Sequence, residues 1–435
     1  MKNILLFGAL ALSISASSVA QAAIHAHDVD PSLEQRFIQV QAKDKSERSK
    51  IADTGMSIEF LRSDSVWGFA DAQSIQEITQ KGFKILGNFD REVARGGHQG
   101  VFSFPSKDDA FHDYAELTKA LNDLEKANPE LAKVHVIGKS LEGRDMLAIQ
   151  INSEPASLAK GQSNKAGVIF MGNHHAREHL SVEVPFMLAQ HLLNNKKDAQ
   201  IRALLESRDI WIVPMVNPDG AEYDISGRNY KMWRKNRRNN GDGTFGVDLN
   251  RNYGYLWGTG GSSKNTNSET YMGSAPFSEP ETQVMKAFVE NHLNAKVLLS
   301  FHSYSELILY PWGSSNDPIV NQQDHGVFTK MAKTMSAWNG YKPEQSSDLY
   351  ITSGDTTDWA YGEHGIFAFT FELSPRGGLF GGGFYPGAKA IEPTFKANLK
   401  PCLYLLEVAQ DPYQVLNTAS ARRIQNKFEL NPLNF

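Results

Sequence analysis

The chain has 435 residues, with 44 Lys and Arg against 49 Asp and Glu, so its formal net charge is −5 at pH 7. Hydrophobic residues make up 41% and charged residues 21%, which excludes disordered, collagen-like and multi-span membrane chains. The excess of acidic over basic residues argues against nucleic-acid binding. The single cysteine, Cys402, excludes an intramolecular disulfide and Cys-rich metal clusters. A metal site would therefore need His and carboxylate ligands.

The first 22 residues have the pattern of a secretory signal peptide. Lys2 supplies the positive charge, residues 4–12 are apolar, and Ala20-Gln21-Ala22 resembles a cleavage site. The apolar stretch is too short to span about 30 Å of hydrocarbon, and no later segment has the roughly 18 apolar residues of a membrane helix. We therefore expect an exported protein, secreted or periplasmic, whose mature chain starts near Ala23 and has no membrane span.

Residues 23–107 predict a small α+β module. The expected strands are residues 36–40 and 65–69, and the expected helices are residues 46–51 and 72–80. A stretch rich in Gly and Arg follows at residues 91–105. Because domain boundaries and proteolytic sites concentrate in such exposed stretches, a second domain is expected to begin near residue 108.

Strand and helix patterns alternate over residues 108–412. Continuous apolar runs of strand length favour strands that are covered on both faces of a sheet. The expected strands are residues 134–138, 146–151, 166–171, 210–215, 296–301 and 366–371, and the expected helices are residues 180–194 and 279–293. We predict an α/β fold with a mixed, largely parallel central sheet flanked by helices. The polar residues 413–435 are an extension that is either ordered or loose.

A metal-ligand pattern follows the apolar run at residues 166–171. His175 and Glu178 are three positions apart, on one side of a helical turn, and His302 follows the run at residues 296–301. Two imidazoles and a carboxylate leave one coordination position of zinc open for catalysis. The same segment also spells H-x-x-E-H through His179, a pattern in which both histidines bind zinc and the glutamate is the base. These residues alone leave Glu178 as either ligand or base.

His175-Ala176-Arg177-Glu178 resembles the H-x-R-E element of the zinc metallocarboxypeptidases, the carboxypeptidase A/B family with its secreted bacterial members of the carboxypeptidase T type. Further motifs follow in the family's order, at residues 217–220, 233–235, 246–252, 300–305, 350–355 and 370–373. The resemblance extends from about residue 111 to about residue 406. It implies the family's fold, one Zn²⁺ per catalytic domain with His175, Glu178 and His302 as ligands, and a peptidase acting on C-termini.

The resemblance also assigns roles to the remaining site residues. Glu372 matches the general base, and Arg234 matches the arginine that stabilises the oxyanion. Asn250 and Arg251 match the pair that holds the substrate carboxylate, and Tyr350 matches a tyrosine that closes over the bound residue. Arg177 matches a subsite arginine, and Asp248 matches the partner that orients His175. Asp355 and Thr357 fall where the family reads the terminal side chain. Since Thr357 is neither apolar nor acidic while Asp355 adds a carboxylate, we predict a broad preference for apolar and also basic C-terminal residues.

By its position, the N-terminal module resembles the family's inhibitory prosegments. We therefore expect a zymogen, monomeric, that an activating protease cuts between Lys84 and Asp109; the competing interpretation is a permanent accessory domain. The resulting division is signal peptide 1–22, prosegment 23–107, catalytic domain 108–412 and C-terminal extension 413–435.

Other enzyme classes fit the chain less well. A serine hydrolase would need a G-x-S-x-G element, which the sequence lacks, and Gly138-Lys139-Ser140 is not a P-loop because position 133 is Lys. The alternative is an amidase or endopeptidase that cuts peptidoglycan stem peptides with the same zinc set. Asn250, Arg251 and Tyr350 favour ordinary peptide C-termini.

Overall fold

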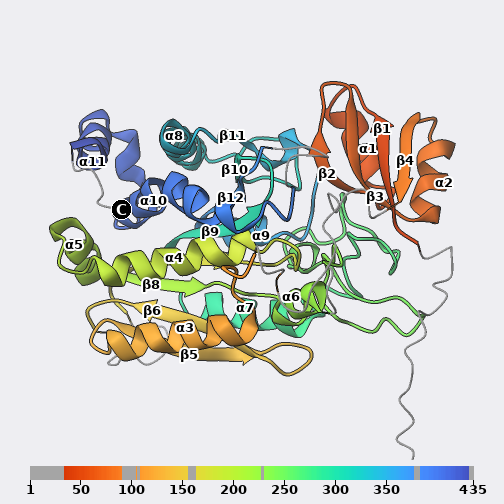
Figure 1. The fold of residues 1–435 in the computed structure, drawn as a ribbon. Coiled ribbons are helices and arrows are strands. Elements are labelled where there is room, and N and C mark those ends of the chain that lie inside the picture. The colour runs from red at the N-terminus through yellow and green to blue at the C-terminus, as the bar shows by residue number, and fades with distance from the viewer. Residues whose placement is uncertain are drawn as a thin grey trace, which may run out of the picture.

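A computed structural model describes residues 34–90, 104, 108–154, 163–226, 230–376 and 383–430 of the chain. They form a small N-terminal module beside a large α/β domain (Figure 1). The predicted signal peptide lies outside the described residues. Within the described ranges, no helix is both long enough and apolar enough to cross a membrane.

The N-terminal module is a four-stranded antiparallel sheet of order β2-β3-β1-β4 with two helices. Its elements are β1 (Arg36–Gln41), α1 (Lys45–Ala52), β2 (Ser57–Leu61), β3 (Ser65–Ala70), α2 (Ala72–Gln80) and β4 (Ile85–Asp90). Asp44 and Asp71 cap the two helices by accepting hydrogen bonds from backbone N–H groups of the first turn. The expected strands and helices of this module are confirmed, while β2 and β4 were missed.

The α/β domain is built on an eight-stranded mixed sheet of order β11-β10-β12-β9-β7-β8-β6-β5. Its strands are β5 (Ala132–Lys139), β6 (Asp145–Ile151), β7 (Ala166–Gly172), β8 (Arg208–Val213), β9 (Ala295–Ser303), β10 (Leu307–Tyr310), β11 (Lys342–Gln345) and β12 (Phe367–Leu373). The four middle strands are parallel, and antiparallel pairs join them on both sides. The predicted mixed sheet is confirmed, and β7 and β8 are buried at every residue, as their apolar runs indicated.

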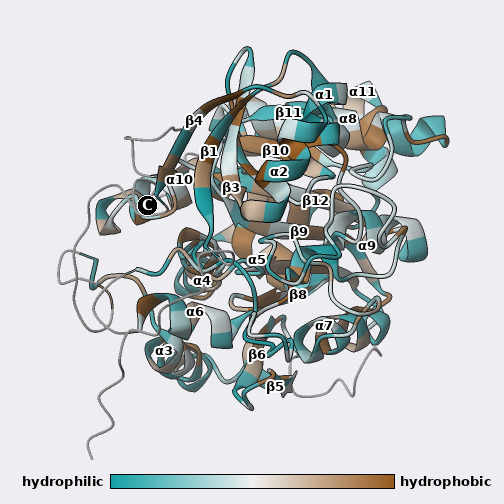
Figure 2. Cartoon of the chain, turned by 90° about the vertical axis from the view of Figure 1, so that its right-hand side faces the viewer, coloured by the Kyte–Doolittle hydropathy of each residue, from teal (hydrophilic) through white to brown (hydrophobic). Residues whose placement is uncertain are grey.

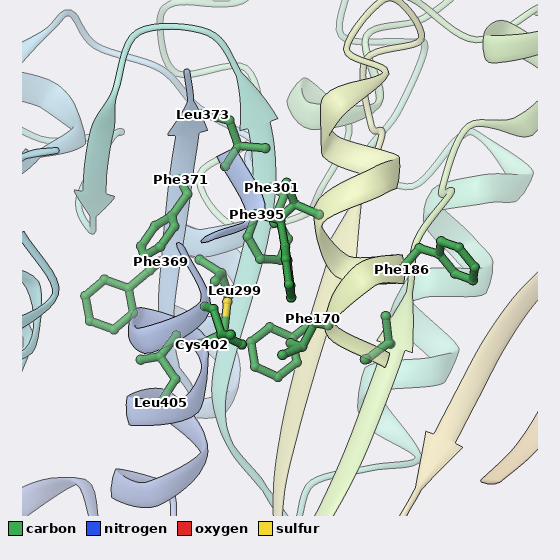
Figure 3. Packing of buried hydrophobic residues seen from close by; sticks show 14 of the residues in the cluster. Phe170, Phe186, Leu299, Phe301, Phe369, Phe371, Leu373, Phe395, Cys402 and Leu405 are labelled. Atoms are coloured by element: carbon green, nitrogen blue, oxygen red, sulfur yellow. The ribbon is translucent and has the colours of Figure 1, made fainter. Parts of the chain in front are cut away.

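Helices cover both faces of the sheet. They are α3 (Tyr114–Ala127), α4 (Leu180–Asn194), α5 (Ala199–Ser207), α6 (Pro218–Ile225), α7 (Pro280–Glu290), α8 (Gln322–Asn339), α9 (Thr356–His364) and α10 (Ile391–Val408). On one face, Phe170, Phe301 and Phe371 pack with residues of α4 and α10, where Cys402 is buried as a free thiol (Figure 3). On the other face, α7 and α9 cover a second apolar cluster. Figure 2 shows apolar colour on the inner strands and polar colour on much of the outer helices.

The described part of the C-terminal extension packs against the α/β domain. After the short turn η6 (Pro412–Leu416), helix α11 (Thr418–Leu430) places Phe428 in the core. Its ring centroid lies 5.6 Å from that of Trp338 in α8 and 6.5 Å from that of Tyr404 in α10. Of the two alternatives for the extension, the ordered one is observed for residues 413–430, and residues 431–435 lie outside the described residues.

Candidate active site

Three neighbouring parallel strands, β7, β9 and β12, end at the same edge of the sheet. In α/β sheets this carboxyl edge is where ligands bind. His175 and Glu178 follow β7 in the turn before α4, and His302 lies near the end of β9. Glu372 lies near the end of β12 and is the register partner of His302. The sheet order thus gathers four residues that are far apart in the sequence.

The three predicted metal ligands converge on one point. His175 Nδ1 lies 2.7 Å from Glu178 Oε1, and His302 Nδ1 lies 3.1 Å from His175 Nδ1 and 3.0 Å from Glu178 Oε2. Atoms that ligate one tetrahedral zinc ion at about 2.0–2.1 Å are about 3.3 Å apart, so the observed spacing fits a shared ion. All three residues are buried, and among the described residues they are the set with metal-site spacing.

Asp248 connects the metal set to Arg234. His175 Nε2 lies 3.1 Å from Asp248 Oδ1, while Arg234 Nε and Nη2 donate to Asp248 Oδ2 at 3.0 and 2.9 Å. Burial would raise the pKa of Asp248, but Arg234 and His175 outweigh it and hold that pKa well below its usual range. An ionised Asp248 keeps the proton of His175 on Nε2 and leaves the Nδ1 lone pair for a metal. The structure thus places Asp248 in contact with His175, and its orienting role stays a prediction.

The two carboxylates at the site have opposite pKa shifts. Burial alone would raise the pKa of Glu178, but the charges of His175 and His302 outweigh it and lower this pKa well below its usual range. Burial, and then the negative charge of Glu178, raise the pKa of Glu372 well above its usual range. Carboxylates whose surroundings push their pKa values apart serve different chemical roles.

A cavity of about 630 Å³ opens above these residues. The predicted site residues that line it are His175, Glu178, Arg234, Asn250, Arg251, Tyr350, Asp355, Thr357 and Glu372. Glu372 is the half-buried residue of an otherwise buried strand, which places its side chain at the cavity surface. His302, Asp248 and Arg177 are buried and are not among the residues that line it. Tyr304 also lines the cavity but received no role from the sequence, although it directly follows Ser303 in the motif that holds His302.

Asn250 and Arg251 are held in place by polar contacts beside the cavity. Asn250 Oδ1 accepts hydrogen bonds from the backbone N–H and the hydroxyl of Thr356, at 3.0 and 2.9 Å. Arg251 donates from Nη1 to the Asn250 carbonyl at 2.8 Å and from Nε to the Gly261 carbonyl at 3.1 Å. These contacts orient both side chains at the wall of the cavity before any substrate binds.

Asp355 and Thr357 form the start of helix α9. Asp355 Oδ1 caps the helix by accepting from the backbone N–H of Thr357 at 3.0 Å and of Asp358 at 2.9 Å, and from the Thr357 hydroxyl at 2.7 Å. The other oxygen, Oδ2, is buried and has no hydrogen-bond partner among the described residues. Asp355 thus has a structural role in addition to its place in the cavity wall.

The N-terminal module covers Arg177 and closes over the cavity. Arg177 is fully buried; its Nη2 donates to Glu59 Oε1 in β2 at 2.8 Å and its Nη1 to Glu269 Oε2 at 3.1 Å. Tyr350 donates its hydroxyl to the Ile58 carbonyl of the same strand at 3.1 Å. Sequence reasoning missed Glu59; the available signal was one acidic residue inside the apolar pattern of residues 57–61.

The neighbouring histidines of the loop point elsewhere. His179 Nε2 lies 2.9 Å from Asp224 Oδ2, and His174 Nε2 lies 2.8 Å from the hydroxyl of Tyr253. The structure therefore groups Glu178 with His175 and His302, and it places His179 in a separate buried contact. The H-x-x-E-H arrangement, which needs His175 and His179 on one metal ion, receives no geometric support from these contacts.

Comparisons with known proteins agree with this geometry. A family described as zinc carboxypeptidase matches residues 117–401. A zinc carboxypeptidase of Saccharothrix mutabilis subsp. capreolus is 34% identical over 397 residues, covering 86% of this chain and 90% of that protein. Carboxypeptidase B of Astacus astacus is 32% identical over 312 residues, covering 70% of this chain and 98% of the relative. The carboxypeptidase A structure from Helicoverpa armigera shares the fold, with a TM-score of 0.70 and 24% identity over 89% of this chain and 99% of that one.

Proposed function

Since the chain belongs to the zinc carboxypeptidase family, whose members are zinc-dependent peptide hydrolases, we propose that it is an exported enzyme that removes C-terminal residues from peptides and proteins. The observation that carries the proposal is the convergence of His175, Glu178 and His302 beside Glu372, at a cavity that Asn250 and Arg251 also line. Export rests on the signal-like pattern of residues 1–22.

The roles of the site residues follow from their positions. Bound zinc lowers the pKa of a water molecule and polarises the scissile carbonyl group. Glu372 takes a proton from the attacking water and delivers it to the departing amine, a transfer that its raised pKa favours. Arg234 is held by Asp248 through Nε and Nη2, which leaves Nη1 to donate to the developing oxyanion.

Recognition of a chain end is assigned to Asn250 and Arg251, which also line the cavity. The Arg251 guanidinium provides charge and directional donors for a terminal carboxylate. Because Asn250 Oδ1 is engaged by Thr356, its amide nitrogen is the group left to donate to the same carboxylate. The Tyr350 hydroxyl is held by the Ile58 carbonyl, and we expect Tyr350 to close over the bound residue once the N-terminal module has left.

The first test of the proposal is hydrolysis of N-terminally blocked tripeptides that differ in their last residue. The processed enzyme is expected to release Phe and Lys but to act poorly on Glu, because Asp355 brings negative charge to the pocket. Release is measured by amino-acid analysis, with and without a zinc chelator. Cleavage of muropeptide stem peptides without cleavage of the tripeptides would instead identify the peptidoglycan enzyme, and a preference for Glu would contradict the proposed pocket.

We also propose that residues 23–107 are an inhibitory prosegment of a monomeric zymogen. Strand β2 supports this, because Ile58, Glu59, Phe60 and Leu61 line the cavity together with the proposed catalytic residues. Glu59 neutralises Arg177, and the carbonyl of Ile58 engages Tyr350. We expect a bound peptide substrate to compete with this strand for the part of the cavity that the strand lines.

The substitution Glu59→Gln is expected to weaken docking of the module and to raise the activity of the uncut chain. Removing one partner from a buried ion pair costs about 3–5 kcal/mol, and Gln retains part of the contact, so a gain of roughly tenfold or more in latent activity is expected. Hydrolysis of a blocked tripeptide by the unprocessed protein measures it. The matched control is Glu77→Gln in α2, where Glu77 accepts a hydrogen bond from Gln73 of its own helix. Equal latent activity in both variants would contradict the inhibitory role of Glu59.

The activating cut is proposed to fall after strand β4. Lys84 and the strand itself belong to the folded module, since β4 pairs with β1 along its length up to Asp90. Asp108 is already part of the catalytic domain, where it accepts hydrogen bonds from the Tyr230 hydroxyl and the Ala388 N–H. N-terminal sequencing of the active enzyme tests this proposal, and retention of residues 36–90 would favour the accessory domain.

A further inference from the structure

We propose that Glu344 in strand β11 is a specificity-determining residue that, with Asp355, selects C-terminal Lys and Arg. The inference rests on the proposed carboxypeptidase function and deepens it by naming the class of terminal residue. The sequence assigned no role to Glu344. Two observations support the role of Glu344, namely its position in the sheet and its unpaired carboxylate oxygen.

Register pairing aligns Glu344 with the cavity. Glu344 pairs with Leu309 of β10, and Leu309 pairs with Thr370 of β12. Because paired residues of adjacent strands project from the same face of a sheet, the three side chains point to one side, and all three residues line the cavity. Thr370 lies two residues before Glu372 on the same face. Glu344 therefore belongs to the row next to the one that carries the proposed base.

Asp355 reaches the same region from helix α9. A Cβ atom placed on Gly313 would lie 3.2 Å from Asp355 Oδ2 and 3.4 Å from Ser346 Cβ, so both groups flank Gly313. Ser346 is two residues after Glu344 and also lines the cavity. Both carboxylates therefore line the cavity from different elements, with Ser346 near Asp355 and two residues from Glu344.

Each of these carboxylates has one oxygen that is buried and unpaired. Within the described part of the chain, Glu344 Oε1 and Asp355 Oδ2 have no hydrogen-bond partner, and the two residues are only 7% and 6% exposed. The remaining oxygens are engaged, Glu344 Oε2 by the largely exposed Lys342 ammonium and Asp355 Oδ1 by the start of α9. A buried, unpaired carboxylate oxygen is unfavourable, and a cationic substrate side chain relieves this by donating to it.

The chemistry favours a long cationic side chain. Leu309 provides an apolar wall for methylene groups, while the ammonium of Lys or the guanidinium of Arg would contact the carboxylates at the end. A terminal Glu would bring a third negative charge to these carboxylates. Terminal Phe and Leu would bind through the apolar wall and gain nothing from Glu344, so a substitution there separates the two substrate classes.

The test compares Glu344→Gln with the wild-type processed enzyme on tripeptides ending in Arg, Lys and Phe. A hydrogen bond to a charged group corresponds to about 10- to 100-fold in a rate or binding constant. We expect kcat/KM for Arg and Lys to fall by about tenfold or more, with little change for Phe. Lys342→Met is expected to act oppositely, raising kcat/KM for Arg and Lys, because it frees Glu344 Oε2. The control Glu363→Gln removes the same charge from an exposed position of α9.

Calorimetric titration with free arginine and free phenylalanine separates this inference from the proposed function. Weaker arginine binding to Glu344→Gln, with unchanged phenylalanine binding, supports the pocket even if neither protein hydrolyses a tripeptide. Selective loss of arginine binding together with the absence of hydrolysis would overturn the proposed carboxypeptidase activity but support the proposed subsite. Equal changes for Arg and Phe substrates, or no change for either, would overturn the role of Glu344 while the activity stands.

Discussion

Glu372→Gln is expected to reduce kcat by about 10²- to 10⁴-fold while the protein retains its zinc. The amide has nearly the same shape as the carboxylate but cannot take the proton of the attacking water. Because Glu372 belongs to a different strand from the three ligands and is not among the metal donors, its loss should leave the metal set intact. Steady-state hydrolysis of a blocked tripeptide and elemental analysis of zinc measure the two quantities.

Glu290→Gln is the matched control for the Glu372→Gln substitution. Glu290→Gln at the end of α7 removes a half-exposed carboxylate far from the site and should leave kcat near its original value. A Glu372→Gln enzyme with unchanged kcat would exclude Glu372 as the base. A variant without zinc would instead indicate that Glu372 supports the metal set, contrary to the geometry described here.

The central sheet could be predicted because its strands are buried on both faces. Val168, Phe170 and Ile212 belong to continuous apolar runs, and a run of that length between turn residues predicts a strand with little ambiguity. The short strands β10 and β11 escaped prediction, since four residues such as Lys-Pro-Glu-Gln of β11 carry no periodic signal. Strand β4 also escaped prediction, because its residues alternate between partly buried and exposed and none is fully buried.

The site residues could be named from motifs, but their mutual contacts could not. Periodicity places His302 and Glu372 at strand ends, yet only the sheet order makes them neighbours. The bridge from Asp248 to both His175 and Arg234 joins three separate motifs, and no spacing along the chain encodes it. The same holds for Glu59 and Arg177, whose ion pair depends on how the two parts of the chain dock.

Glu178→Gln is expected to lose zinc, which distinguishes the two assignments that the H-x-x-E-H string permits. Replacing even an outer partner of a metal ligand costs about 10- to 100-fold in affinity, so loss of a ligand should cost at least the upper value. The neutral amide also removes the negative charge that His175 and His302 stabilise at this position. Zinc titration of the dialysed variant measures the affinity, and circular dichroism confirms that the fold is kept.

His179→Gln is the decisive comparison, because His179 is a ligand in the rival assignment and a partner of Asp224 in the structure. If Glu178 is the ligand, His179→Gln retains zinc and Glu178→Gln does not. If Glu178 is the base, Glu178→Gln retains zinc without turnover, and His179→Gln loses it. The geometry favours the first outcome, because Glu178 Oε1 and Oε2 lie 2.7 and 3.0 Å from the Nδ1 atoms of His175 and His302, so all three side chains can share one ion.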